Sequence, residues 1–339
     1  MSSSKNSSWK SVLLRHETIL FFVLAAEWIF FDSIGRNFGT LDNSFDILRH
    51  SCEIGLLAVA MTPVILTGGI DLSVGSLLGL CAILFGKLWR DAQLPIWAAA
   101  LSTLGIGAIA GSLNAVLITW LRLPALIVTL GTYSLFRGLA EAITHGVDTF
   151  TDFPGSFLFL GQERWLGIPA QAPVFILVTI FFWLLVHRTA FGRSFRAIGF
   201  SPEGARYAGI PVARRVSMTY VLAGIVSAIA AIVYVARIGQ AKADAGTDYE
   251  LLAITAVVLG GTSIFGGIGS VHGTILGVAA IAVLESGMVH ALEPRELARM
   301  FTGVLLILAL TSSVAPKLIS ALRARKSAPK LPKQYSTTA

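Results

Sequence analysis

Apolar windows of about twenty residues recur along this chain between Ile19 and Ala315, and short polar segments separate them. A helix needs roughly 20 apolar residues to cross the hydrocarbon of a bilayer, so each window predicts one membrane-spanning helix. The pattern therefore predicts an all-α, polytopic membrane protein with about ten transmembrane helices. The expected spans are residues 18–36, 47–67, 71–88, 95–120, 124–142, 170–187, 215–236, 250–265, 269–289 and 298–315.

One boundary between predicted spans is marked by a glycine-rich stretch and not by charged residues. The segment from Leu251 to Leu284 contains no Asp, Glu, Lys or Arg over 34 residues. It is too long for a single crossing, and the stretch "FGGIGS" at 265–270 is the natural position for a turn. We therefore predict two spans in this segment.

The composition supports a membrane protein. The chain has 339 residues, of which 55% are hydrophobic and 13% charged, whereas a soluble domain carries about 25% charged residues. The formal net charge is +7, but the basic residues flank the apolar windows instead of forming one basic domain, which argues against nucleic-acid binding. Neither the two cysteines nor the scattered histidines have the spacing of a metal site, so no metal ligands are predicted.

The distribution of charge fixes the direction of the spans, because short loops rich in Lys and Arg stay in the cytoplasm. The segment from Arg188 to Arg215 carries six arginines and one glutamate, and the tail after Pro316 carries six basic residues and no acidic one. Residues 141–171 and 240–250 lean acidic and are expected outside. Both termini are therefore predicted to be cytoplasmic. The resulting division is an N-terminal tail (1–17), a transmembrane domain (18–315) with a cytoplasmic loop (188–215), and a basic C-terminal tail (316–339).

Two uncharged segments share a pattern. The segments "TPVILTGGIDLSVGS" (62–76) and "TAVVLGGTSIFGGIGS" (255–270) each run through apolar residues into Gly-Gly and then through a second glycine-rich turn. Many transporters are built from structural repeats with the substrate path at the repeat interface, so the similarity points to a duplicated translocation core. The alternative is that glycine-rich membrane hairpins resemble one another in any case.

Asp71 is the only charged residue between Ile54 and Gly86. A carboxylate among apolar residues is costly unless something pairs with it, caps a helix with it or uses it. Asp71 is predicted either to be the N-cap of the following helix, with Gly68 and Gly69 supplying the turn, or to line a pathway. The second reading rests on flanking apolar segments that are short for a full crossing, and the two readings are compatible.

Other polar and small residues in the spans are candidates for the same region. The side chains of Asn114, Thr129 and Thr132 are expected to hydrogen-bond between helices or to meet a solute's hydroxyls, with interhelical bonding favoured. Gly75 and Gly79, four residues apart, allow a neighbouring helix to approach closely. The full set of pathway or gating candidates is Gly68, Gly69, Asp71, Ser73, Gly75, Ser76, Asn114, Thr129 and Thr132.

Three further ionisable residues, Glu27, Glu285 and His290, lie within spans, and a structural role is favoured for each of them. The chain shows no arrangement of residues typical of an enzyme. It contains no GxxxxGK[ST] phosphate-binding loop, so it cannot bind or hydrolyse ATP by that route. No catalytic residue and no cofactor is therefore predicted within this chain.

Three ordered segments resemble the permease subunits of ribose-type ABC sugar importers. They are "GGIDLSVGS" (68–76), "NAVLITWLRLPALIVTLGTYSLFRGLA" (114–140) and "TAFGRSFRAIGFSPEGARYAGIPV" (189–212), and the resemblance extends from the second span to the tenth. It implies a multi-pass subunit of the bacterial plasma (inner) membrane that translocates a monosaccharide or sugar-like solute. It also implies that ATP is hydrolysed by separate ATPase subunits. The other implied partners are an external solute-binding protein and a second permease copy or homologous permease, within membrane lipid.

The third of these segments also has a clear local structure. The sequence "SPEGARYAG" predicts a short helix with Ser201 at the N-cap, Pro202 at the first position and Gly209 at the end. The resemblance implies that this helix docks into a groove of the ATPase subunit. The expected docking residues are Glu203, Ala205, Ala208 and Gly209. The alternative is an interfacial loop whose arginines merely meet anionic lipid.

The sequence is also compatible with two other functions. One is a secondary transporter driven by an ion gradient, with Asp71, Glu285 or Glu27 as the ion-linked carboxylate, which would need no soluble partner. The other is an ABC permease for a different small solute, such as a branched-chain amino acid.

Overall fold

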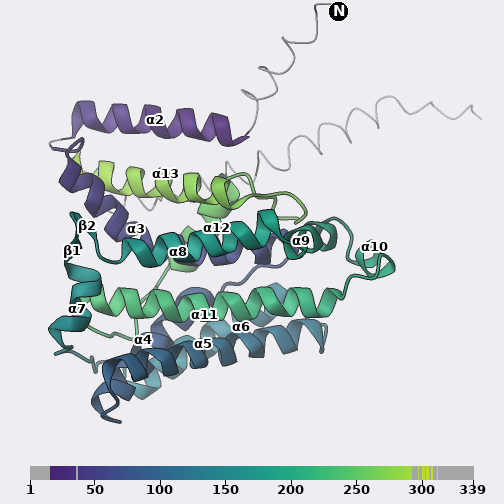
Figure 1. The fold of residues 1–339 in the computed structure, drawn as a ribbon, viewed down its shortest axis with the longest axis horizontal. Coiled ribbons are helices and arrows are strands. Elements are labelled where there is room, and N and C mark those ends of the chain that lie inside the picture. Colours follow the sequence, from purple (N-terminus) through teal and green to yellow (C-terminus); the bar gives the residue numbers. More distant parts are fainter. Residues whose placement is uncertain are drawn as a thin grey trace, which may run out of the picture.

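The structure, a computed structural model, describes residues 16–35 and 37–291, together with single positions between 297 and 311. The described chain is mainly helical (Figure 1). Its first elements are α2 (His16–Ile34), α3 (Leu41–Leu66), α4 (Val74–Arg90), α5 (Ile96–Thr119), α6 (Ala125–Ile143), α7 (Gly155–Gln162), β1 (Arg164–Trp165) and β2 (Ile168–Pro169). They are followed by α8 (Ala172–Trp183), the π-helix η1 (Leu184–Arg188), α9 (Ala190–Phe200), α10 (Pro202–Tyr207), α11 (Val212–Ile238), α12 (Tyr249–Leu259) and α13 (Val271–His290).

Several helices meet the requirements for crossing a membrane. Among the described residues, α3, α5, α6, α11 and α13 are long and apolar enough, and α8 with η1 and α9 makes a sixth candidate that is bent by 68°. This confirms a mostly helical chain with several apolar helices that are long enough to span a membrane. Helices α2, α4 and α12 also lie at predicted spans, whereas the predicted span 298–315 falls mostly outside the described residues. The number of ten spans stays a prediction.

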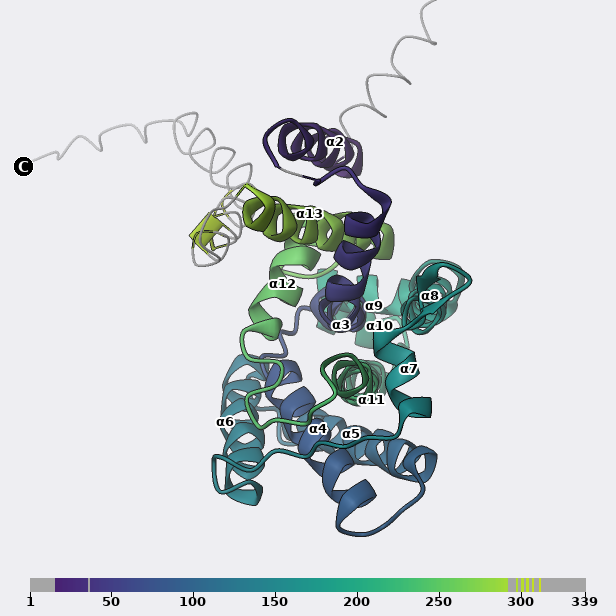
Figure 2. The ribbon, with the colours of Figure 1, turned by 90° about the vertical axis from the view of Figure 1, so that its left-hand side faces the viewer.

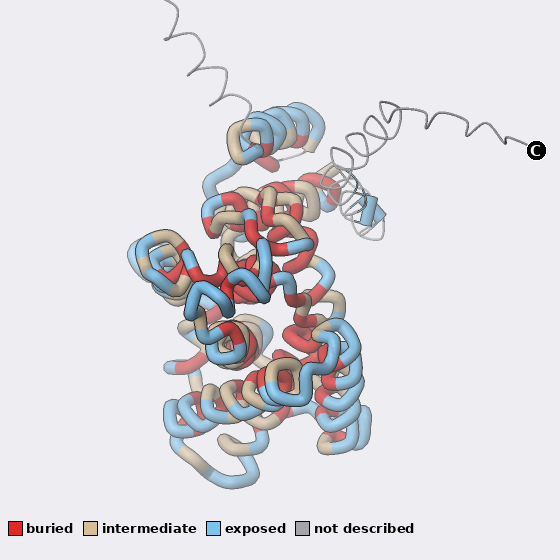
Figure 3. Tube along the Cα trace, turned by 90° about the vertical axis from the view of Figure 1, so that its right-hand side faces the viewer, coloured by how far each residue is buried: buried red, intermediate tan, exposed pale blue. Residues whose placement is uncertain are grey.

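Helix α3 lies at the centre of the helical stack (Figure 2). Of its most apolar window, 78% of the residues are buried, compared with 33% for α5 and 28% for α6. Contacts run from α2 to α13, from α13 to α3, from α3 to α11 and from α11 to α5. Figure 3 shows that the buried residues gather in the interior of the stack.

Helix α3 begins at Leu41, six residues before the predicted span at 47. The hydroxyl of Thr40 accepts a hydrogen bond from the amide of Asn43 at 3.2 Å and so caps the helix before its polar first turns. With 26 residues, α3 is long enough to cross a bilayer. The prediction of a short segment before Asp71 was therefore wrong, although α4 after it has only 17 residues.

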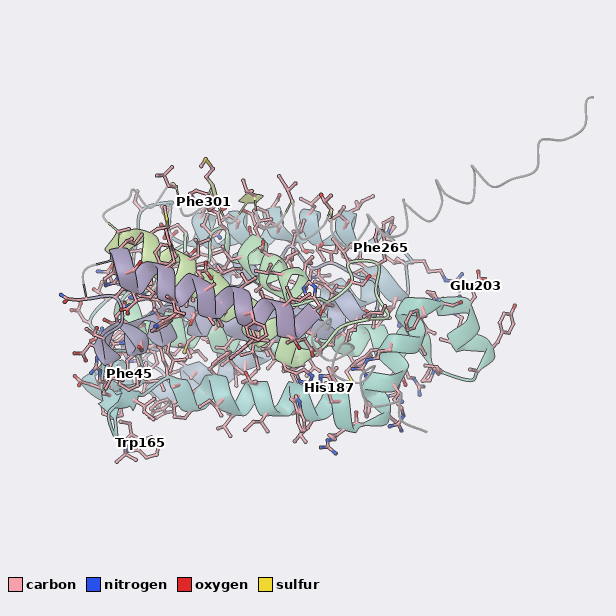
Figure 4. The ribbon with its side chains drawn as sticks, turned by 90° about the horizontal axis from the view of Figure 1, so that it is seen from above. Phe45, Trp165, His187, Glu203, Phe265 and Phe301 are labelled. Carbon is pink, nitrogen blue, oxygen red and sulfur yellow. The ribbon has the colours of Figure 1, made fainter. Side chains whose placement is uncertain are left out.

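The two ends of the stack differ. Helices α9 and α10 lie at one end, here called the α10 end, where Glu203 projects (Figure 4). Helix α7 and the antiparallel pair β1–β2 lie at the other, here called the β1–β2 end, near Phe45 and Trp165. The α10 end contains the arginine-rich segment predicted to be cytoplasmic.

Candidate functional site

The joint between α3 and α4 is a tight turn that closes the end of α3. The amide of Gly68 donates to the carbonyl of Ile65 at 2.9 Å, and the amide of Gly69 donates to that of Val64 at 3.1 Å. Gly68 has a φ of +83°, in the left-handed region that favours glycine. The prediction that Gly68 and Gly69 form the turn is confirmed.

Asp71 lies in this joint and is 2% exposed. Its Oδ1 accepts hydrogen bonds from the amide of Ser73 at 2.9 Å and from the hydroxyl of Ser73 at 2.6 Å. Helix α4 begins at Val74 with Ser73 as its N-cap, so Asp71 is not itself the N-cap that the sequence predicted. Asp71 instead stabilises the turn that leads into the helix, two residues earlier.

The hydroxyl of Ser73 connects this joint to α5. It accepts a hydrogen bond from Nδ2 of Asn114 at 2.8 Å, and both side chains are buried. Asp71, Ser73 and Asn114 therefore form one buried network between two helices. The interhelical role favoured for Asn114 is confirmed.

The other polar candidates behave differently from one another. The hydroxyl of Thr129, on α6, donates to the carbonyl of Ile70 at 3.2 Å and so also reaches the joint. The hydroxyl of Thr132 donates to Val128 of its own helix at 3.1 Å, and no interhelical bond of this side chain is seen in the described structure. The hydroxyl of Ser76 donates to the carbonyl of Ser73 at 2.9 Å, within the first turn of α4.

Tyr220, on α11, belongs to the same region and was not singled out from the sequence. Its ring is fully buried, and a side chain at Gly69 would overlap its hydroxyl. Within the described residues, the hydroxyl of Tyr220 and Oδ1 of Asn114 are buried without a hydrogen-bond partner. No signal in the sequence distinguished Tyr220 from the other polar residues of its predicted span, which include a second tyrosine. Asp71, Ser73, Asn114 and Tyr220 are called the joint cluster below.

The Asp71→Asn variant is expected to fold and transport nearly as well as the wild type, whereas Asp71→Ala loses stability. Asn keeps an oxygen that accepts from the amide and hydroxyl of Ser73, while Ala leaves both buried donors unpaired, at a cost of about 1–3 kcal/mol. Thermal unfolding in detergent and uptake in proteoliposomes measure the two effects. If the Asp71→Asn protein folds but does not transport, the role of Asp71 is not purely structural, and its negative charge is required for translocation.

Gly75 and Gly79 allow a close approach, but the approaching segment is not the helix expected from the sequence. It is the turn that precedes α12: a side chain at Gly75 would overlap the carbonyl of Gly246 and one at Gly79 that of Ala245. Nη1 of Arg137, on α6, also donates to the carbonyl of Ala245 at 3.1 Å.

Arg137 and Glu250 place unexpected charge beside this glycine face. The carboxylate of Glu250, 5% exposed, lies against Gly75, and Nη1 of Arg137 lies against Gly79. Within the described chain, Nη2 of Arg137 and Oε2 of Glu250 are buried without a hydrogen-bond partner. Sequence reasoning missed both residues because each lies at or near the end of a predicted span, where charges usually reach solvent.

The two glycine-rich segments that share a sequence pattern lie against each other. The amide of Gly267 donates to the carbonyl of Leu66, the last residue of α3, at 2.9 Å. Deeper in the stack, the hydroxyls of Thr62 and Thr274 are 2.8 Å apart. The α12–α13 turn is therefore docked onto the α3–α4 joint, the arrangement expected when related segments meet at an interface.

The arginine-rich segment folds as its local sequence predicts. The hydroxyl of Ser201 accepts from the amide of Gly204 at 3.0 Å, Pro202 occupies the first position of α10, and Gly209 follows the helix with a φ of +79°. Figures 1 and 4 show α10 projecting at its end of the molecule. The short capped helix is confirmed.

The proposed docking residues on α10 do not share one face. Glu203, Ala208 and Gly209 are exposed, but Ala205 is 3% exposed and packs with Ile198 and Val212. Ala205 therefore anchors α10 to α9 and α11, which corrects its assignment as an outward docking position.

Tyr207 is the most prominent docking candidate that the sequence did not single out. Its side chain is 93% exposed on α10. A large exposed aromatic residue on a projecting helix is typical of a protein interface.

A contact path joins α10 to the joint. Ala205 packs α10 against Ile198 of α9, and the next residue, Gly199, lies directly against the carbonyl of Leu66 and the amide of Gly267. A side chain at Gly199 would overlap both groups. Helix α9 therefore lies between α10 and the α3–α4 joint and contacts both.

Of the three other ionisable residues predicted within spans, His290 has a hydrogen-bond contact within its own helix. Nδ1 of His290 lies 2.8 Å from the carbonyl of Ser286, within α13. Among the residues that the structure describes, no three His, Cys, Asp or Glu side chains are grouped so as to hold a metal ion. The roles of Glu27 and Glu285 stay predictions.

The family model and the relatives that this chain matches are all described as transport permeases. Residues 43–310 match the family model described as "Branched-chain amino acid transport system / permease component". The chain is 41% identical over 260 residues to the autoinducer 2 import system permease protein LsrD of Yersinia pseudotuberculosis serotype O:1b (strain IP 31758), covering 75% of this chain and 78% of the relative. It is 42% identical over 261 residues to LsrD of Photorhabdus luminescens, covering 76% and 78%. No solved structure matches the chain. On this evidence the chain belongs to the transport permease family that its residues 43–310 match.

Proposed function

We propose that this chain is the membrane-spanning permease subunit of an ATP-binding-cassette importer that translocates a monosaccharide or sugar-like solute. The observation that carries the proposal is the 41% identity to a permease named for autoinducer 2 import, extending over most of both chains. The proposed substrate is therefore a small polar solute of the same class as autoinducer 2. The projecting, capped helix α10 supplies the surface through which such a permease contacts its ATPase subunit.

The proposed topology has ten spans with both termini in the cytoplasm, in the bacterial inner membrane. Within the described residues, helices lie at nine of the predicted positions, and the tenth falls mostly outside these residues. The arginine-rich segment is at the α10 end. Short loops rich in arginine remain cytoplasmic, so the α10 end is assigned to the cytoplasm and the β1–β2 end to the outside.

The proposed partners follow from this role. Two ATPase subunits bind at the α10 end and hydrolyse ATP, because the chain has no phosphate-binding loop. An external solute-binding protein delivers the solute at the β1–β2 end. A second permease packs beside this chain, and the apolar surfaces that α5 and α6 leave exposed are available for it or for lipid.

In the proposed mechanism, ATP-driven movement of the ATPase displaces α10, and α9 passes the displacement to the α3–α4 joint. Gly199 transmits it to Leu66 and Gly267 together, so both glycine-rich turns move as one unit. Packed interfaces switch between discrete arrangements rather than deforming continuously. In the proposed mechanism, such a switch opens the pathway alternately to the outside and to the cytoplasm.

The glycine face of α4 is the proposed wall of the pathway. The joint cluster lies at its α10 end, and Arg137 and Glu250 lie beside Gly75 and Gly79 further along α4. Buried polar atoms without partners are costly unless a ligand satisfies them, and the hydroxyls of a sugar-like solute both donate and accept hydrogen bonds.

The combined variant Glu203→Lys, Ala208→Trp is expected to release the ATPase and to lose ATP-dependent uptake while the permease remains folded. Both side chains are exposed on α10, so the changes alter its surface charge and shape without disturbing the buried contacts of Ala205. Mass spectrometry of the proteins that co-purify with the tagged chain, together with uptake in proteoliposomes, measures both effects.

The matched control is Glu163→Lys, Ala92→Trp, which makes the same changes at exposed positions away from α10. This variant is expected to remain folded and to retain the ATPase, which are the two properties that it controls. Unchanged ATPase binding and transport in the α10 variant would overturn the proposed coupling role. Uptake driven by an ion gradient without ATP would replace the ABC importer with a secondary transporter.

A further inference from the structure

Two neighbouring hollows lie at the α10 end, beside the start of α11. One has a volume of about 550 Å³ and the other about 490 Å³. They share Ala213 and Arg214 in their walls. Between them, the hydroxyls of Thr119 and Ser217 approach to 2.9 Å and hold α5 to α11.

The first hollow is cationic. Arg122 enters it from the α5–α6 turn, Arg206 from α10, and Arg214 from α11. All three are exposed, and in the described part of the chain none of them makes an ion pair. The residues that line the hollow include no Asp or Glu. Three arginines from three separate segments therefore line a common space, and guanidinium groups are suited to binding phosphate oxygens.

The second hollow is apolar and follows α11 away from the first. Its wall contains Arg214, Met218, Val221 and Leu222, which lie on one face of the helix at spacings of three and four residues. Trp120, 77% exposed, closes its side. Because α11 is long and apolar enough to cross a membrane, this stripe leads from the end of the span toward the hydrocarbon.

We propose that the two hollows together bind one anionic phospholipid, with the phosphate of the headgroup among Arg122, Arg206 and Arg214 and an acyl chain along Met218 and Val221. A free phosphate would use only the cationic hollow. The apolar continuation along a spanning helix, with a tryptophan at its mouth, matches a molecule that has a charged head and a long chain. The proposal uses the orientation proposed above, which places this site in the cytoplasmic leaflet.

The experiment is native mass spectrometry of the full chain in mild detergent, titrated with phosphatidylglycerol. One phosphatidylglycerol is expected to bind more tightly than phosphatidylcholine. In the Arg122→Gln, Arg214→Gln variant, its affinity is expected to fall about 30-fold, at about fivefold for each arginine near an anionic headgroup. Arg206 is left unchanged because it belongs to α10. The Val221→Trp variant fills the apolar hollow and is also expected to weaken binding.

The matched control is Arg188→Gln, Arg193→Gln, which removes two exposed arginines, one at the end of η1 and one within α9, outside both hollows. This control is expected to bind phosphatidylglycerol as the wild type does. Equal loss in both double variants would overturn a specific site. If soluble glycerol 3-phosphate displaces phosphatidylglycerol completely and Val221→Trp has no effect, the site binds a free anion and not a lipid. If the Arg122→Gln, Arg214→Gln variant binds phosphatidylglycerol as tightly as the wild type but no longer binds the ATPase, these arginines contact the ATPase and not a lipid.

Discussion

The Arg237→Met variant is expected to lose about 3–5 kcal/mol of stability, because it leaves a buried carboxylate without its cation. Nε of Arg237 on α11 lies 2.7 Å from Oε1 of Glu53 on α3, and the side chains are 10% and 0% exposed. Oε2 of Glu53 has no hydrogen-bond partner within the described residues, so nothing seen there would replace the arginine. Unfolding of the purified chain in detergent, followed by temperature or denaturant, measures the loss.

Two further variants show whether the loss comes from the pair. The double variant Glu53→Leu, Arg237→Met removes both charges and is expected to recover most of the lost stability. Arg164→Met breaks the exposed pair between Arg164 and Asp42, whose side chains are 40% and 79% exposed, and is expected to cost less than about 1 kcal/mol. An Arg237→Met protein as stable as the wild type would show that the buried pair contributes nothing.

The Gly199→Ala variant is expected to reduce ATP-dependent transport about tenfold or more. A methyl group at this position overlaps the carbonyl of Leu66 and the amide of Gly267, which are joined by a 2.9 Å hydrogen bond. Forcing extra volume into a tightly packed contact costs about 1–3 kcal/mol, and backbone atoms cannot turn aside as a flexible side chain does. The added methyl group therefore separates α9 from the α3–α4 joint, through which we propose that the motion passes.

Uptake in proteoliposomes and ATPase binding are measured on the same preparation. ATPase binding is expected to survive in Gly199→Ala, because α10 keeps its exposed surface, while uptake falls. The control is Gly105→Ala on α5, where an added methyl group meets nothing within 4 Å. It is expected to transport normally. If Gly199→Ala transports as well as the wild type, the contact of Gly199 with Leu66 and Gly267 does not transmit the movement of α10 to the joint.

Local sequence was sufficient to predict the elements that depend on neighbouring residues. The start of α10 follows from Ser201 and Pro202, whose roles are fixed within one helical turn. The turn at Gly68 and Gly69 and the division of the long uncharged segment at 265–270 were predicted for the same reason. In each case a glycine, a proline or a capping hydroxyl determines the backbone without help from distant parts of the chain.

Contacts between distant segments could not be predicted in this way. The pairing of Glu53 with Arg237 and the position of Tyr220 beside Gly69 depend on how α11 packs against α3. The inward orientation of Ala205 likewise depends on Ile198 and Val212. The similarity between the two glycine-rich segments did point to a long-range contact, and the hydrogen bond between Gly267 and Leu66 lies there.

That hydrogen bond also sets an order for the biosynthesis of the protein. Leu66 and Gly267 lie in opposite halves of the chain, and the amino-terminal part of a protein emerges from the ribosome first. Helices α3 and α4 therefore enter the membrane well before the segment that completes their joint has been translated. The central helix of the stack is among the first to be inserted, but its end is among the last parts of the molecule to be finished.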